Sequence, residues 1–145
     1  MDPRLYQVFP IIAALGFLVT GLMIALRPNA NTIRGAWIAP AALAGLFLGW
    51  SSFTVSKEGL AAVWAEHVHG AWGNQIWFDL LLGVGSAFAL LAPRARTVGM
   101  RPLPWFLLIA GTGCIGLLAM LSRYLFLAER SEASELGPQR GRARA

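Results

Sequence analysis

Four long apolar stretches, separated by short polar segments, set the pattern of this chain of 145 residues. A helix that crosses a bilayer needs about 20 mostly apolar residues. Four ranges meet that length: 8–26, 37–55, 73–92 and 103–127. Inside hydrocarbon every backbone polar group needs a partner within the protein, so these ranges are predicted to be helices. None shows the alternation of a membrane β-barrel strand. The pattern therefore predicts an all-α, integral membrane four-helix bundle.

Between the second and third apolar ranges lies a segment, 56–74, that is too polar to cross a bilayer. Its apolar side chains recur at helical spacing and share one face: Leu60, Val63, Trp64 and Val68. Glu58, Glu66 and His69 fall on other faces. This pattern predicts a short amphipathic interfacial helix that lies on the membrane surface.

The end of the chain differs in composition from the rest. After Glu129 the sequence is polar, contains Gly and Pro, and has no apolar periodicity, which is typical of a disordered segment. We therefore expect a single transmembrane domain over 1–130 and a disordered polar tail over 131–145.

Composition supports a membrane location. Charged residues make up 13% of the chain and hydrophobic residues 57%, whereas a soluble domain has about 25% charged residues. The basic residues stand at the ends of apolar ranges, and aromatic residues do not alternate with them, so a nucleic-acid surface is not expected. The single cysteine, Cys114, excludes an intrachain disulfide. We expect a multi-pass protein of a bacterial cytoplasmic (inner) membrane.

Basic residues near the apolar ranges also bear on orientation, because cytoplasmic loops are enriched in Lys and Arg. The loops after the first and third ranges hold Arg27, Arg34, Arg94, Arg96 and Arg101, and the opposite side holds Arg4, Lys57 and Arg130. An even number of spans places both termini on one side of the membrane. The charges near the membrane favour both termini outside, whereas further arginines late in the tail favour the reverse.

Asp79 is the one acidic residue within the four apolar ranges, and Arg123 is the one basic residue. A carboxylate at the centre of a membrane helix costs about 2.5–3.5 kcal/mol on insertion scales, so it faces the bundle interior, finds a partner or stays protonated. The third and fourth ranges are joined by a short loop, which predicts antiparallel neighbours. The leading hypothesis is therefore a structural polar pair of Asp79 and Arg123.

Two alternatives to this pair stay open: Asp79 is a functional acid, or it merely lies at the membrane interface. Counted from the shared loop, Asp79 lies about 20 Å along its helix and Arg123 about 30 Å along its own, at 1.5 Å per residue. Arginine's length and a helix tilt narrow that gap, and Arg123 can also extend alone to the headgroups. Asp79 is then free to act as a proton donor or a ligand contact.

Glu66, His67 and His69 form a second polar cluster, just before the third span. Histidines two residues apart point to different sides of a helix, so no metal site is expected. Haem ligation needs histidines inside the spans, which hold none. The cluster is interpreted as a solvated interfacial segment. The alternative is that Glu66 and one of the histidines cover a polar opening above Asp79.

Small residues occur at several positions in three of the spans. They are Ala41, Gly45 and Gly49 in the second, Gly83, Gly85 and Ala87 in the third, and Gly111, Gly113 and Gly116 in the fourth. Such positions let helix backbones approach closely. They favour helix packing, including packing between copies of the chain. The alternative is room for a flat lipid or isoprenoid ligand.

The second half, "FDLLLGVGSAFALLAPRARTVGMRPLPWFLLIAGTGCIGLLAMLSRYLFLAER", resembles the bacterial DUF2834 membrane family. The resemblance rests on an early intramembrane acid, a basic loop, a Gly-Met turn, a Trp that begins the last helix and the closing stretch, which here are Asp79, 94–96, Gly99 and Met100, Trp105, and 123–130. The family usually has a proline before its Leu-Phe-Leu stretch, where this chain has Arg123 and Tyr124.

That family is distantly similar to small membrane-embedded terpene cyclases, which protonate an isoprenoid with a carboxylic acid. The resemblance implies Asp79 as the acid or its partner, Glu66 as the second carboxyl, and an isoprenoid as ligand. General acid catalysis needs a protonated carboxyl, which burial among apolar groups favours. An arginine beside Asp79 favours the ionised form instead, so the ion-pair and catalytic interpretations compete.

The leading functional interpretation is a small multi-pass membrane protein with a structural or accessory role. The alternative is a membrane-embedded isoprenoid- or lipid-modifying enzyme that uses Asp79 and Glu66. A small multidrug transporter fits less well, because the first span holds no acid. The expected partners are membrane lipids and further copies of the chain through its glycine-rich faces. No cofactor is expected, and whether the chain is an enzyme is left open.

Overall fold

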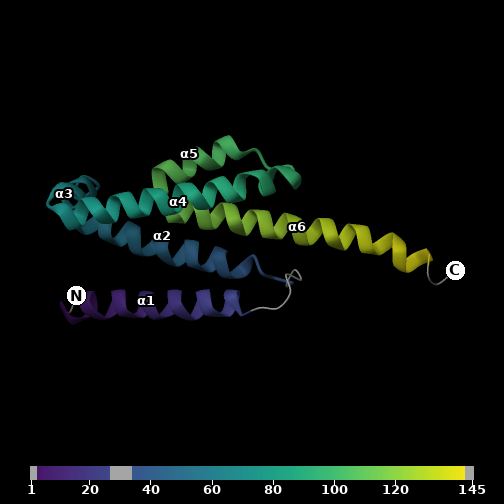
Figure 1. Cartoon of the computed structure of the whole chain (residues 1–145), viewed down its shortest axis with the longest axis horizontal. Helices are drawn as coiled ribbons and strands as arrows, with labels where there is room; N and C mark the ends of the chain where they lie inside the picture. Colours follow the sequence, from purple (N-terminus) through teal and green to yellow (C-terminus); the bar gives the residue numbers. More distant parts are fainter. Residues whose placement is uncertain (1–2, 27–33, 143–145) are drawn as a thin grey trace. The chain divides into compact units, whose positions relative to one another are not determined.

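The computed structural model of the protein describes residues 3–26 and 34–142. These residues form six helices and no strand (Figure 1). The helices are α1 (Pro3–Ala25), α2 (Ile38–Glu58), α3 (Ala62–Val68), α4 (Ala71–Thr97), α5 (Pro102–Thr112) and α6 (Cys114–Arg142). The predicted all-α class is confirmed.

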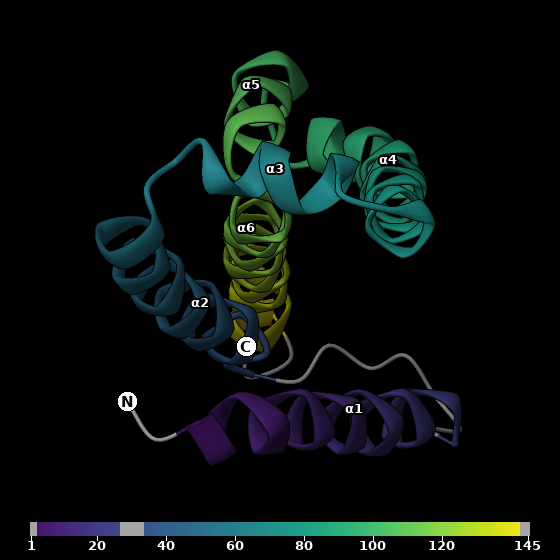
Figure 2. The same cartoon turned by 90° about the vertical axis from the view of Figure 1, so that its left-hand side faces the viewer.

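The chain divides into two compact units. The first, Met1–Thr32, contains α1, whose described side chains from Gln7 onward are all exposed. The second, Ile33–Ala145, contains α2 to α6. Within the second unit, α6 lies at the centre, with α2, α4 and α5 around it (Figure 2). The expectation of a single domain over 1–130 stays a prediction.

Among the described residues, three helices are long and apolar enough to cross a membrane: Gln7–Ala25 in α1, Ile38–Glu58 in α2 and Ala71–Thr97 in α4. They coincide with the first three apolar ranges of the sequence and support a multi-pass membrane protein. α4 runs beyond the predicted end at 92, through Pro93, to Thr97. Proline removes one backbone donor from a helix interior. Pro93 is exposed near the helix end, where the freed carbonyl can find water.

The fourth apolar range is not one continuous helix. α5 ends at Thr112, and α6 begins at Cys114. Gly113 lies between them with φ 58° and ψ −125°, a backbone conformation that is open to glycine and strained for residues with a Cβ. The chain reverses there, so that α5 and the first part of α6 form a helical hairpin (Figure 1). With 11 residues, α5 is about 16 Å long, too short for a hydrocarbon core of about 30 Å.

A close backbone contact completes this α5–α6 hairpin. A Cβ on Gly116 would stand 2.9 Å from the backbone N and Cα of Ile109 and 2.8 Å from Oγ1 of Thr112. Only a residue without a side chain lets α6 approach α5 so closely. The Gly113 N–H donates to the Ile109 carbonyl at 2.6 Å, and the Thr112 hydroxyl donates to the Leu108 carbonyl at 2.7 Å. The stretch 112–116 therefore encodes the reversal.

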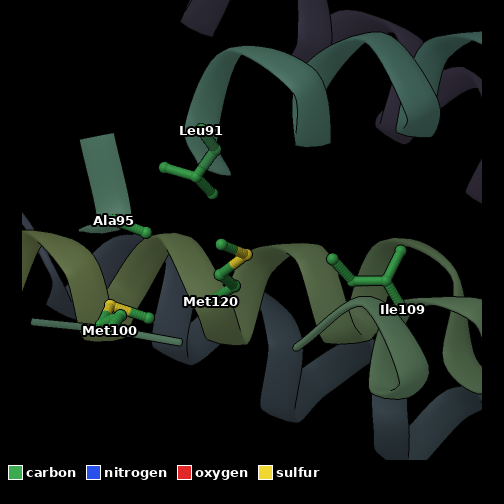
Figure 3. Packing of buried hydrophobic residues seen from close by; sticks show 5 residues of the cluster. All are labelled: Leu91, Ala95, Met100, Ile109 and Met120. Atoms are coloured by element: carbon green, nitrogen blue, oxygen red, sulfur yellow. The ribbon is translucent and has the colours of Figure 1, made fainter. Parts of the chain in front are cut away.

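The hairpin makes α6 run in the same direction as α4, where the sequence predicted antiparallel neighbours (Figure 1). A small buried cluster joins α4, α5 and α6: Leu91, Ala95, Met100, Ile109 and Met120. Figure 3 shows Leu91 and Ala95 of α4 on the side of α4 that faces Met120 of α6. The cluster therefore fixes the register of the two helices.

The remaining differences lie at the two ends of the second unit. α6 continues as helix to Arg142, where the sequence predicted a disordered tail from 131, and 143–145 lie outside the described residues. The interfacial segment does form a short helix, α3. A Cβ on Gly73 would collide with the Glu66 carbonyl oxygen, so α3 lies directly on the start of α4. The rings of His67 and Trp77 meet edge to face at 4.5 Å.

Gly113→Ala tests the reversal. An alanine at φ 58° is expected to lower the free energy of unfolding by about 1–3 kcal/mol, seen as a melting temperature in detergent several degrees below that of the parent protein. Gly111→Ala is the matched control, because no described atom lies within 4 Å of its Cβ position and alanine favours a helix by about 0.5–1 kcal/mol. Equal melting temperatures for both variants would contradict the turn.

Candidate functional site

Asp79 lies on the outward face of α4. The residues of α4 that pack against the rest of the unit recur at helical spacing, and each is buried or half-buried: Gly73, Trp77, Leu80, Val84, Phe88, Leu91 and Ala95. Asp79 is exposed and stands about 200° around the helix from Trp77 at 3.6 residues per turn. Its carboxyl group makes no hydrogen bond or ion pair with any described residue of α2 to α6.

The neighbours of Asp79 on this face are small or polar. Gln75, Gly83 and Ser86 lie one turn before, one turn after and two turns after it, and all are exposed. We call these four residues, Gln75, Asp79, Gly83 and Ser86, the Asp79 face. Large apolar side chains flank it, including Ile76, Phe78 and Leu82, which are 59%, 56% and 69% exposed. The carboxyl group therefore lies among exposed apolar side chains, on the surface of α4 that faces away from α3 and α6.

Arg123 lies on a different side of the unit, on α6. Its guanidinium carbon is 5.8 Å from the centroid of the Phe126 ring. Arg130 contacts the same ring, with its guanidinium carbon 4.6 Å from the centroid. Arg123 and Arg130 are both exposed, and neither makes an ion pair with a described side chain.

The structure does not bring Asp79 and Arg123 together. Met120 packs with Leu91 and Ala95, so Arg123, a turn further along α6, lies level with the end of α4. Asp79 stands roughly 24 Å before Ala95 along α4, at 1.5 Å per residue. The expected pairing assumed an uninterrupted last helix, and the reversal at Gly113 removes that premise. The pair stays a prediction that no contact supports.

Glu66 is exposed on α3 and does not converge with Asp79. Its backbone carbonyl packs on Gly73, on the side of α4 that also holds Trp77, whereas Asp79 points the other way. The Nδ1 atom of His67 bonds to the Val63 carbonyl. Within the described part of the chain, no three His, Cys, Asp or Glu residues are grouped closely enough to hold a metal ion.

A double-mutant cycle separates the two accounts of Asp79 and Arg123. Because the side chains lie far apart, the effects of Asp79→Asn and Arg123→Ala on the free energy of unfolding in detergent should add to within about 0.5 kcal/mol. A larger departure from additivity would restore the polar pair and contradict the parallel arrangement of α4 and α6.

An open groove between α2 and α6 is the feature that the sequence pattern did not reveal. Its walls are Ala41 and Ala44 of α2 and Ala119 of α6, and Arg123 lines it as well. Trp37 and Phe126 close one end with ring centroids 5.5 Å apart and an interplanar angle of 81°. The sequence gives one indication of it: Ala41, one of the small residues interpreted as a helix-packing position, lines the groove.

Two hydrogen bonds between distant parts of the chain hold this end of the groove. The Ser122 hydroxyl donates to the Trp37 carbonyl at 2.9 Å. The Gly35 N–H donates to Oε2 of Glu129 at 3.1 Å. Both bonds fix the start of α2 against the middle of α6, so the aromatic pair and the alanine walls keep a defined spacing.

Described arginines gather at one end of the second unit, where α2 begins and α4 ends (Figure 1). They are Arg34, Arg94, Arg96, Arg101, Arg123 and Arg130. The other end holds Lys57 with the acids Glu58 and Glu66. The sequence predicts Arg130 on the side of Lys57. In the structure Arg130 lies at the arginine end instead, because the α5–α6 hairpin reverses the direction of α6. Arg27, counted with that end in the sequence, lies outside the described residues.

This charge distribution keeps the loops with Arg34, Arg94, Arg96 and Arg101 on the side that the sequence predicted, but it moves the C-terminal end of α6 to that same side. Cytoplasmic ends of membrane proteins are rich in Lys and Arg, so we expect the arginine end in the cytoplasm. A C-terminal fusion should then be cytoplasmic, and a fusion inserted at 59–61 should lie outside, as measured with fluorescent-protein and alkaline-phosphatase reporters. Four complete spans would instead place both fusions on one side.

Comparisons of the chain with protein-family models, with curated proteins and with solved structures give no match, so the resemblance to the DUF2834 family gains no support from them. What the structure defines is a class: over residues 3–26 and 34–142 it is all-α, with three helices long and apolar enough to span a membrane.

Proposed function

We propose that the protein is a structural or accessory component of a bacterial inner membrane that acts by binding other membrane helices, in the first place those of a second copy. The observation that carries this proposal is the exposed carboxyl group of Asp79 among the exposed apolar side chains of α4. Because a charge facing acyl chains is costly, intramembrane acids almost always face protein. A partner helix that covers the Asp79 face supplies the missing donor.

The glycines support association beyond the single chain. Gly73 and Gly116 are needed for close contacts inside the second unit. At other glycines an added Cβ would have no described atom within 4 Å: Gly45, Gly49, Gly83, Gly85 and Gly111. Glycine in a membrane helix that serves no internal packing is typical of a helix–helix interface. Gly45 and Gly49 on α2 and Gly83 on α4 are therefore available to a partner.

The Asp79 face is suited to a symmetric pair of α4 helices. In a two-fold contact the same surface is used by both copies. If the two helices cross near Gly83, the Gln75 amide of one copy lies about one turn from the Asp79 carboxyl of the other. An amide can donate to a carboxyl in either protonation state. The face therefore contains both the acceptor and a donor that it needs.

Cysteine cross-linking in native membranes tests this contact. In a Cys114→Ser background, Ser86→Cys on the Asp79 face should give a disulfide-linked dimer of twice the chain mass. Leu81→Cys, about 200° around α4 from Asp79, is the matched control and should not. Adding Asp79→Leu should weaken the dimer about 3- to 20-fold, the range of interhelical polar contacts in membranes.

The result of the Ser86→Cys cross-linking distinguishes a second copy, a different partner and no interface. A Ser86→Cys adduct of another mass would keep the accessory role and replace the second copy with a different partner. If Ser86→Cys forms no adduct, or if Asp79→Leu leaves the adduct unchanged, the Asp79 face is not an interface and the proposal fails.

The exposure of Asp79 also supports a second candidate function, an isoprenoid- or lipid-modifying enzyme. Asp79 is open to the bilayer, from which an isoprenoid could reach it. Glu66 meets α4 through its backbone carbonyl at Gly73, on the side away from Asp79, so no contact within the described structure groups the two acids. The accessory role predicts identical lipid extracts from cells that carry the parent protein and Asp79→Asn. A cyclised isoprenoid that is lost in Asp79→Asn would favour the enzyme.

A further inference from the structure

The groove between α2 and α6 combines apolar walls with positive charge. The side chains of Ala41, Ala44 and Ala119 end in small methyl groups, which leaves the groove between the two helices open. Ala44 is 9% exposed, and Arg123 at the same groove is exposed. A ligand that fits must therefore present an apolar chain to the walls and an anion to the guanidinium.

Two arginines contact one aromatic ring that lines the groove. Arg123 and Arg130 both lie over the Phe126 ring, at 5.8 Å and 4.6 Å from its centroid. The acid nearest to them in the sequence, Glu129, directs a carboxylate oxygen to the Gly35 N–H and forms no ion pair with either arginine in the described structure. Neither arginine at the groove is therefore neutralised by an ion pair with a described side chain.

The position of the groove along α6 suits a lipid headgroup. Arg123 lies level with the end of α4, where Arg94 and Arg96 stand, and Trp37 closes the groove at the same level. Tryptophan and arginine are enriched at the boundary between hydrocarbon and headgroups. A phosphate would meet Arg123 there, while an acyl chain follows the alanines toward the middle of the membrane.

We propose that this groove is a binding site for one anionic phospholipid of the surrounding membrane. The phosphate is bound by Arg123 and Arg130, and one acyl chain lies along Ala41, Ala44 and Ala119. Guanidinium groups bind phosphate through paired charge-assisted hydrogen bonds, and basic pockets between membrane helices on the cytoplasmic side bind lipid headgroups. The site is separate from the Asp79 face and independent of the proposed association.

The experiment measures lipid binding to the full-length protein. Delipidated protein in detergent is titrated with phosphatidylglycerol or phosphatidylcholine, and bound lipid is counted by native mass spectrometry. We expect one tightly bound phosphatidylglycerol and a clear preference over phosphatidylcholine. Arg123→Gln should weaken phosphatidylglycerol binding about tenfold, the scale of a hydrogen bond between charged groups.

Two further variants separate the groove from general surface charge. Arg96→Gln removes an exposed arginine at the same end, outside the groove, and should leave binding unchanged. Ala119→Leu fills the groove without altering charge and should weaken binding as Arg123→Gln does. Circular dichroism and melting temperature confirm that each variant is folded.

Three results would overturn the proposal. Equal losses for Arg96→Gln and Arg123→Gln would show nonspecific attraction to the arginine end. Unchanged binding to Ala119→Leu would show that no acyl chain uses the groove, as would competition by glycerol phosphate at the same concentration as the lipid. Absence of any phosphatidylglycerol bound to the parent protein would show that the groove is not a site for an anionic phospholipid.

Discussion

The backbone reversal at Gly113 is the constraint on which the second unit depends. It requires a positive φ at Gly113 and the absence of a side chain at Gly116, where α6 meets the backbone of Ile109. Neither condition contributes much apolar burial. Together they divide an apolar run, long enough for one membrane helix, into two segments that pack on each other and return the chain to the side from which it came.

The other features of the unit follow from that reversal. Because α6 runs parallel to α4, its arginines join those at the end of α4, and the charge of the unit becomes strongly one-sided. Arg123 moves away from Asp79 and toward Trp37, where α2 and α6 form an alanine-walled groove. Asp79 is left on an outward face without a partner among the described residues of its own unit. The two polar groups that appear in the sequence as one pair thus belong to two separate surfaces.

The sequence predicted the elements better than their arrangement. Long apolar runs predict the candidate membrane helices α1, α2 and α4, because the thickness of a bilayer sets the length that such a helix needs. The turn at Gly113 was not predictable, since Gly111, Gly113 and Gly116 look alike in a sequence, and only the backbone shows which of them has a positive φ and which has a close neighbour. Asp79 and Arg123 were recognised as exceptional residues, but their pairing rested on an assumed direction for the last helix. The groove is formed by residues far apart in the chain, such as Ser122 and Trp37, whose hydrogen bond joins positions 85 residues apart. A local sequence pattern therefore could not predict it.

The most direct test is a disulfide between α4 and α6 in native membranes. In a Cys114→Ser background, the pair Leu91→Cys and Met120→Cys should cross-link rapidly, because Leu91 and Met120 belong to one buried cluster. An unbroken last helix antiparallel to α4 would instead bring Met120 level with Gln75. Rapid linking of Gln75→Cys with Met120→Cys, and none between Leu91→Cys and Met120→Cys, would contradict the reversal and everything that depends on it.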